Sequence, residues 1–196
     1  EYDPMDTTEA AELVAKMKSI VPKYVRIQRV QRDIPSPIVD AGVKKSNLRQ
    51  YAREGLKEMG ETCDCIRCRE VGHSDIDVDM SKVELNAIKY LASKGDEYFL
   101  EYGDNDVIIA YARLRISEKN LPTIRELKVL GEMTPINEEG DDYQHRGFGK
   151  KLVDRCESIA EEYSDKIRVT SGVGAREYYR KLNYSLNKPY MMKKLE

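Results

Sequence analysis

One ten-residue stretch organises the chain: Tyr143-Gln144-His145-Arg146-Gly147-Phe148-Gly149-Lys150-Lys151-Leu152. Its pattern, Gln144-x-x-Gly147-x-Gly149, places two glycines where a polar turn opens into a helix. Glycine lets the backbone approach a ligand closely, and the first N–H groups of a helix have no partner inside it, so the stretch predicts an anion-binding loop. The Gly-Lys-Ser/Thr ending of a P-loop is missing, which argues against a nucleoside triphosphate with magnesium. A plain helix start without a ligand remains the alternative.

The residues after this loop predict alternating helices and strands. Apolar side chains recur at helical spacing, with charged residues between them, at Phe148, Leu152, Cys156, Ile159 and Tyr163. The pattern then predicts, in order, a strand over 166–171, a glycine turn over 172–174, a helix over 175–182 and an extended segment from Asn183.

This order resembles the acetyl-CoA core of the GNAT acetyltransferases, whose loop reads Gln/Arg-x-x-Gly-x-Gly/Ala. Over nearly the whole chain, further motifs resemble the catalytic-subunit family of Elongator: Arg125-Glu126-Leu127, Gln144 to Gly149, Ser171-Gly172-Val173-Gly174, Tyr178-Tyr179 and Pro189-Tyr190-Met191. The resemblance implies an α/β (α+β) GNAT acyltransferase fold, with a mixed, mostly antiparallel central sheet flanked by helices. A zinc-bound linker and a remnant of a radical-SAM barrel would precede that domain.

The Elongator family modifies wobble uridine in tRNA, so the resemblance implies an acyltransferase, a tRNA uridine(34) acetyltransferase or carboxymethyluridine synthase. Acetyl-CoA would be cleaved in the GNAT domain, and radical chemistry from S-adenosylmethionine would place the acetyl group on C5 of the uridine. The family's Cys-x3-Cys-x2-Cys motif for a [4Fe-4S] cluster is absent from the 196 residues. We expect the ligands of the iron–sulfur cluster and of S-adenosylmethionine outside this chain. A protein lysine (histone-type) N-acetyltransferase and a non-catalytic module that binds tRNA and acetyl-CoA stay open.

Length and resemblance together suggest three parts. The 196 residues suffice for one sizeable core or two small ones. We expect the end of a radical-SAM domain with a basic tRNA-binding segment over 1–58, a zinc-binding linker over 59–80 and a GNAT domain over 81–196. The first residue is not Met, so we expect a piece of a longer protein. No apolar run approaches the roughly 20 residues that span a bilayer, and no signal peptide is visible, so we expect a cytoplasmic protein without a membrane partner.

Positive charge is concentrated near the start of the chain. The net charge is only −2, but residues 16–57 carry 11 Lys and Arg against three acidic residues. Clustered Lys and Arg are what binds a phosphate backbone, so this segment predicts a contact with tRNA. The residues assigned to it are Arg26, Arg29, Arg32, Lys44, Lys45 and Arg49. A solvated charged face is the alternative, and other Elongator-type subunits or self-association remain possible partners.

Three of the four cysteines lie within six positions, as Cys63-x-Cys65-x2-Cys68, and His73 follows five residues later. Without a secretory signal, such spacing indicates a metal site rather than disulfides, and thiolates bind zinc tetrahedrally. The family has a zinc site here, and His73 is the candidate fourth ligand. Cys156 is a rival, although its place on an amphipathic helix favours a core residue. Reduced structural thiols are the alternative reading of the trio.

The resemblance also assigns the acyl-CoA contacts. The cofactor-binding residues would be Glu126, Leu127, Lys128, Val129, Gln144, His145, Arg146, Gly147, Phe148, Gly149, Lys150, Gly172, Tyr178 and Tyr179. Backbone N–H groups from Arg146 to Lys150 would hold the pyrophosphate, and the pantetheine arm would pair with the strand edge at 126–129. Tyr178 or Tyr179 would give a proton to the leaving thiolate; adjacent tyrosines on a helix point about 100° apart, so we expect one of them to face it. Glu126 is a third catalytic candidate or a solvated carboxylate, and His145 a loop side chain.

The remaining segments give local expectations. Asp6-Thr7-Thr8-Glu9 predicts a capping box before a helix that ends near Pro22. Further expectations are a strand over 24–31, helices over 47–59 and 81–93, strands over 97–102, 107–116 and 123–130 with a hairpin turn at 103–106, and a surface loop over 131–143.

Overall fold

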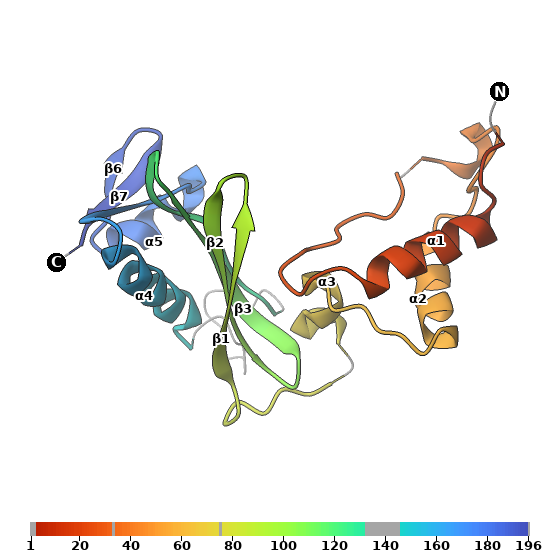
Figure 1. Cartoon of the computed structure of the whole chain (residues 1–196), viewed down its shortest axis with the longest axis horizontal. Coiled ribbons are helices and arrows are strands. Elements are labelled where there is room, and N and C mark those ends of the chain that lie inside the picture. The colour runs from red at the N-terminus through yellow and green to blue at the C-terminus, as the bar shows by residue number, and fades with distance from the viewer. Residues whose placement is uncertain (1–2, 33, 75, 132–145, 196) are drawn as a thin grey trace. The chain divides into compact units, whose positions relative to one another are not determined.

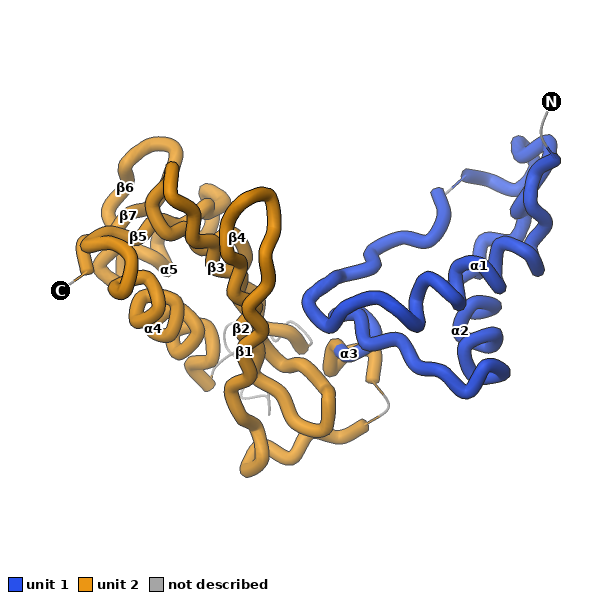
Figure 2. The backbone as a smooth tube through the Cα atoms, viewed as in Figure 1, with its two compact units in different colours: residues 1–69 blue, residues 70–196 orange. Residues whose placement is uncertain are grey.

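The computed structural model describes residues 3–32, 34–74, 76–131 and 146–195. The chain divides into two compact units, Glu1–Arg69 and Glu70–Glu196, which Figure 2 shows in different colours. The 59–80 segment expected as a linker is therefore shared between them, and the predicted part boundaries stay predictions. None of the helices in the described ranges is long and apolar enough to cross a bilayer.

The first unit is built around a pair of helices. Its elements are α1 (Thr7–Ser19), η1 (Ser36–Ile38), α2 (Leu48–Glu58) and α3 (Ile66–Arg69). The predicted capping box is confirmed, because the Asp6 side chain accepts from the N–H groups of Thr8 and Glu9 while Glu9 accepts from the Asp6 N–H. Small residues bring α1 and α2 together: a β-carbon on Gly55 would lie 3.4 Å from the β-carbon of Ala15.

The strand predicted over 24–31 is wrong. The segment is irregular, and three of its carbonyl groups accept from the Arg49 side chain and from the first N–H of α3 instead of from a neighbouring strand. The Arg49 guanidinium donates to the carbonyls of Ile27 and Gln28, each at 3.0 Å, and the Ile66 N–H donates to Val25 at 2.9 Å. The alternation of apolar and polar residues resembled that of a strand. Donors from distant parts of the sequence satisfy these carbonyl groups, so no partner strand is needed.

The second unit is a sheet covered by helices. Its strands are β1 (Glu84–Ala92), β2 (Gly95–Asp104), β3 (Val107–Ser117), β4 (Asn120–Val129), β5 (Lys166–Val169), β6 (Ser185–Asn187) and β7 (Tyr190–Lys194). Within the described residues they form one sheet in the order β1-β2-β3-β4-β5-β7-β6, antiparallel except for the parallel β4–β5 pair. The helical elements are η2 (Val71–His73), α4 (Phe148–Glu161), η4 (Val173–Ala175) and α5 (Arg176–Arg180). This is the mixed, mostly antiparallel sheet that we expected.

The helix predicted over 81–93 is wrong, because β1 occupies most of that range. It pairs with β2 from Glu84 opposite Gly103 to Ala92 opposite Gly95, so the unit begins with a four-strand meander. The turn uses Ser93 and Lys94 at φ 46° and 62°, a left-handed conformation that neither residue type indicates in the way that Gly or Asn would. Pairing with a neighbour overrode a pattern that fitted a helix equally well.

The helix α4 packs on one face of the sheet (Figure 1). Leu152, Val153 and Cys156 are completely buried in a core that includes Ile124 of β4 and Ile167 of β5. Burial raises the pKa of the Cys156 thiol, so it stays protonated in this core. The prediction of Cys156 as a small core residue is confirmed.

Candidate acyl-CoA site and thiol cluster

The strands β4 and β5 separate after a short contact. They pair at two positions, Thr123 with Arg168 and Ile124 with Val169, and the Thr170 N–H donates to Ile124 at 3.1 Å. Beyond Ile124, residues 125–129 keep β3 as partner on one edge, while no strand in the described ranges pairs with the other edge. Backbone groups on that edge are thus placed to pair with an extended, amide-containing ligand.

A β-bulge lies where the strands part. Arg113 of β3 stands opposite Glu126 and Leu114 stands opposite Ile124, so Arg125 is the extra residue. Leu127 and Val129 consequently pack against the core on the α4 side. Bulges re-aim side chains and are frequent beside active sites.

The start of α4 faces this opening. Gly147 takes the N-cap position at φ 77°, and no side chain of the described residues caps the helix. The first bond inside the helix runs from the Lys151 N–H to the Gly147 carbonyl at 3.0 Å. The N–H groups of Phe148, Gly149 and Lys150 precede that bond and stand at the positive end of the helix dipole. A β-carbon on Gly147 would meet nothing within 4 Å, so the described residues leave room here for an anion. The residues fit a pyrophosphate.

The two adjacent tyrosines of α5 point into different environments. Tyr179 is 5% exposed and packs edge-on against the Tyr184 ring, 5.7 Å between centroids, so it is a core residue. Tyr178 is 37% exposed, and its hydroxyl lies 2.9 Å from the point that a β-carbon on Gly149 would occupy. Burial of its ring, together with the nearby Asp154 carboxylate, raises the pKa of Tyr178, so the phenol is protonated at neutral pH. Of the two candidates, Tyr178 is placed to donate a proton to a ligand at α4.

Glu126 is held by three donors on the other face of the sheet. Its carboxylate accepts from Tyr111 at 2.9 Å, from Arg113 Nε at 2.9 Å and from Lys128 at 2.8 Å. Burial by itself would raise the pKa of Glu126, but the bonds from Lys128, Arg113 and Tyr111 outweigh it and lower that pKa. The lowered pKa makes this carboxylate a weak base, and the catalytic role of Glu126 stays a prediction.

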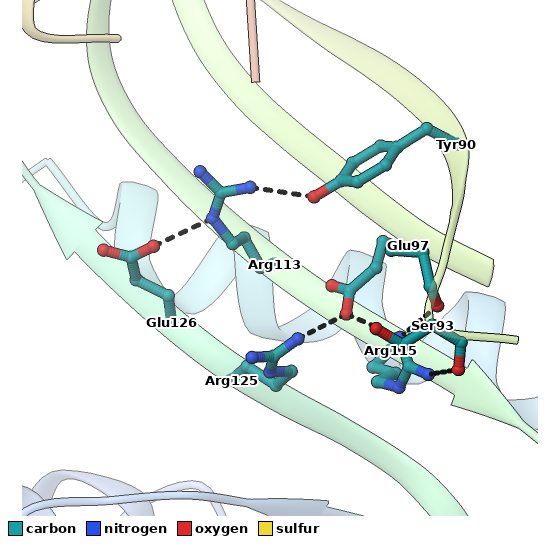
Figure 3. Close-up of polar contacts among 8 residues, drawn as sticks. Tyr90, Ser93, Glu97, Arg113, Arg115, Arg125 and Glu126 are labelled. Carbon is teal, nitrogen blue, oxygen red and sulfur yellow. Dashed lines mark hydrogen bonds and ion pairs between the residues drawn. The ribbon is translucent and has the colours of Figure 1, made fainter. Parts of the chain in front are cut away.

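This polar face continues along the strands, as Figure 3 shows. Glu97 is 1% exposed and accepts from Arg115 at 3.1 Å and from Arg125 at 2.6 Å. Arg113 also donates to the Tyr90 hydroxyl at 2.9 Å. These bonds tie the bulge to β1, β2 and β3.

Sequence reasoning missed two further polar groups beside the opening. Ser171 directly follows the last bond between β5 and β4, and Arg176 is the first residue of α5. Ser171 Oγ and Arg176 Nε are both buried without a hydrogen-bond partner among the described residues. Ser171 has the same alternation as the core residues Ile167 and Val169, which places it on the α4 side of the sheet.

The predicted contacts Gln144 and His145 lie outside the described residues, as does most of the loop expected over 131–143. Arg146, Lys150 and Gly172 are exposed.

The three clustered cysteines meet in the first unit. The Sγ atoms of Cys63, Cys65 and Cys68 all lie within 4.8 Å of one another. Thiolates at this separation need small movements to reach the roughly 2.3 Å zinc–sulfur distance, so the donor set fits zinc. Hydrogen bonds from Cys63 and Cys68 hold the pKa of Cys65 well below its usual range. His73 belongs to the second unit, where its Nε2 lies 3.7 Å from a Glu70 carboxylate oxygen, and its role as a ligand stays a prediction.

The basic residues divide into two groups. Arg49 holds the carbonyls of Ile27 and Gln28, and Lys45 donates to the Tyr51 hydroxyl at 2.7 Å, so both have structural roles. Arg26, Arg29, Arg32 and Lys44 lie in the irregular segment between α1 and α2. RNA binding by all six remains a prediction.

Comparison with known proteins agrees with this geometry. Residues 1–58 match the Radical_SAM C-terminal domain, and residues 66–184 match the Acetyltransferase (GNAT) family. The chain is 44% identical to a tRNA uridine(34) acetyltransferase of Methanocaldococcus jannaschii, and the match covers 100% of this chain and 40% of that protein. It is 41% identical to the human Elongator complex protein 3, covering 100% of this chain and 39% of the relative.

A solved structure, the archaeal Methanocaldococcus infernus Elp3 with an N-terminal deletion, superposes with a TM-score of 0.88 at 41% identity. That match covers 100% of this chain and 50% of the other. The chain spans about two fifths of the length of the curated relatives that it matches.

Proposed function

Because the chain belongs to the acetyltransferase (GNAT) family, we propose that its second unit binds acetyl-CoA and cleaves the thioester to acetylate uridine 34 of tRNA. That reaction is named for the archaeal relatives. In the route implied by the Elongator resemblance, the acetyl group ends as a carboxymethyl group on C5, through S-adenosylmethionine chemistry outside this chain.

The observation that carries the proposal is the opening between β4 and β5 beside the start of α4. The N–H groups of Phe148, Gly149 and Lys150 would hold the pyrophosphate. Val129 lies next to Gly149, so an arm running from there along the free edge of β4 towards Glu126 reaches the bulge. The thioester end would then lie near the point where the strands part.

Acetyl-CoA supplies an activated acyl group, and the protein supplies a proton. Thioester cleavage releases a thiolate, which a protonated phenol can neutralise. Tyr178 is exposed, protonated and adjacent to Gly149, whereas the Tyr179 ring is fixed in the core. Ser171 Oγ and Arg176 Nε, both buried without a partner among the described residues, would be further donors.

The first unit would bind the tRNA. Arg26, Arg29, Arg32 and Lys44 are concentrated in the irregular segment, and phosphate contacts of this kind are independent of sequence. A metal at the three cysteines would stabilise the stretch that follows α2, because structural metal binding is coupled to local folding.

Calorimetry of acetyl-CoA binding tests the site on the chain itself. Gly147→Glu with Gly149→Glu places two carboxylates where the pyrophosphate would lie and should abolish binding. Lys94→Glu with Lys119→Glu, in exposed turns at the other end of the sheet, should leave it unchanged. Unchanged affinity in a folded Gly147/Gly149 variant would refute the site.

The acceptor is tested on a longer protein that contains this chain. Acetyl-CoA turnover should rise on addition of tRNA and not on addition of a lysine peptide. The reverse result would favour the protein lysine acetyltransferase.

A further inference from the structure

A lysine is buried beside the three cysteines. Lys18 lies on the same face of α1 as Ala11 and Ala15, seven and three residues earlier, and that face packs towards α2. The alanine side chains permit the close approach already seen at Gly55. As a result Lys18 is only 2% exposed, a degree of burial that is rare for lysine.

The ammonium group of Lys18 contacts a sulfur atom of the cysteine cluster. Lys18 Nζ donates to Cys68 Sγ at 3.4 Å. A neutral thiol is a weak acceptor and would leave much of the cost of burying an ammonium ion uncompensated. A thiolate carries the negative charge that a buried ammonium requires. The geometry therefore places a buried ammonium group against one sulfur of the cluster, where a metal-bound thiolate would supply the negative charge.

Charge balance extends the argument to the whole cluster. Three thiolates around a divalent cation carry one net negative charge, and a neutral fourth ligand such as a histidine leaves that charge unchanged. The structure places the buried Lys18 ammonium against a sulfur of this cluster, whereas the guanidinium of Arg69, also buried, donates to the carbonyls of Asp64 and Lys23. We propose that Lys18 is a positioning residue that neutralises a divalent metal–thiolate centre at Cys63, Cys65 and Cys68, and so sets its affinity for the metal.

Zinc competition with a chromophoric chelator tests the proposal without reference to activity. Lys18→Met keeps an unbranched apolar stem for the buried site and removes the charge. Loss of a partner of a metal ligand typically lowers metal affinity about 10–100-fold, and we expect a decrease in that range. Lys16→Met, at an exposed position of the same helix, is the matched control and should bind zinc like the parent. Wild-type affinity in Lys18→Met overturns the proposal.

A spectroscopic measurement separates a counter-charge from a direct ligand. With cobalt(II) in place of zinc, Lys18→Met should show an unchanged d–d absorption pattern at saturating metal, because the coordinating atoms are the same. A changed pattern would mean that Lys18 Nζ itself binds the metal, and would overturn the proposal. If Lys18→Met does not fold, Lys18→Gln removes the charge with a polar side chain and takes its place. Lys18→Arg keeps the charge and should retain most of the affinity.

Discussion

The hydroxyl oxygen of Tyr178 lies 2.9 Å from the position that a β-carbon on Gly149 would occupy. The next atom of the tyrosine, Cζ, would lie at 3.7 Å, an ordinary van der Waals distance. The absence of a side chain at Gly149 thus makes room for one oxygen atom. The effect of a substitution at Gly149 on stability should therefore depend on whether residue 178 carries a hydroxyl group.

Gly149→Ala should gain little stability by itself, because the clash with the Tyr178 hydroxyl offsets the helix propensity of alanine. In a Tyr178→Phe background the clash is gone, and the same change should stabilise the protein by about 0.5–1 kcal/mol. Urea unfolding of the four proteins measures this coupling. Strict additivity would contradict the contact.

Tyr178→Phe should lower acetyl-CoA cleavage about 100-fold, the smaller part of the usual range for a lost proton donor. The pKa of Tyr178 is raised, so the phenol remains protonated through neutral pH, and the rate should fall only above the ordinary tyrosine range near pH 10. That alkaline limb should disappear in the variant. Tyr179→Phe keeps the ring that packs on Tyr184 and is the control; an equal loss in both variants would remove Tyr178 from the mechanism.

Purified protein should contain about one zinc per chain, as a closed four-ligand site holds. Cys65→Ala should lose the metal and lower the melting temperature of the first unit, since the loop around the cysteines would lose its crosslink. Cys156→Ala should keep the metal, because that thiol is in the other core. Elemental analysis together with thermal unfolding checks both; a metal-free parent with three titratable thiols in this loop would disprove zinc.

Arg26→Glu with Arg29→Glu should weaken tRNA binding for most tRNA sequences alike and reduce its dependence on salt, as expected for phosphate contacts. Acetyl-CoA affinity should be unaffected. Lys166→Glu with Lys181→Glu reverses two exposed charges in the second unit and serves as the control. Filter binding across salt concentrations gives the slopes, and equal slopes for the parent and the Arg26/Arg29 variant would place the RNA elsewhere.

Glu157→Ala should destabilise the second unit by about 3 kcal/mol. The Glu157 carboxylate is buried and accepts from the Tyr184 hydroxyl at 2.8 Å and from Lys193 at 2.6 Å, so its removal leaves a partly buried ammonium without its anion. Replacing Glu161, which is exposed on the same helix, with Ala should cost little. Thermal unfolding distinguishes them.

Periodic segments with strong turn signals could be predicted from sequence. The helix after Gly147 has an unbroken apolar stripe, and the β2–β3 hairpin turns at Asn105 and Asp106, which tolerate the left-handed conformation found there. β1 could not be predicted in this way, because its strand character comes from pairing with β2 across a Ser93-Lys94 turn. The irregular segment over 24–31 was missed for the same reason, because its shape depends on the distant Arg49, which bonds its carbonyl groups.

The candidate site was predictable in outline and not in its finer contacts. Helical geometry predicts that one of two adjacent tyrosines faces the ligand, but the choice of Tyr178 depends on packing between Tyr179 and Tyr184. Lys18 and Cys68 are 50 positions apart in sequence, and no local pattern joins them. Ser171 gains its importance from the point where β5 stops pairing with β4.

The extra residue at Arg125 shifts the alternation of side chains along β4 by one position, so the parts before and after it alternate out of step. Ile124 before it and Leu127 after it both reach the α4 side, although an unbroken strand would send them to opposite faces. If Arg125 instead took an ordinary place in a regular ladder, every residue that follows would exchange faces, turning Glu126 and Lys128 into the apolar core and Leu127 and Val129 away from it. A residue inserted here without a second bulge would exchange these faces, whereas deletion of Arg125 would keep them and remove the bulge together with the bond from Arg125 to Glu97.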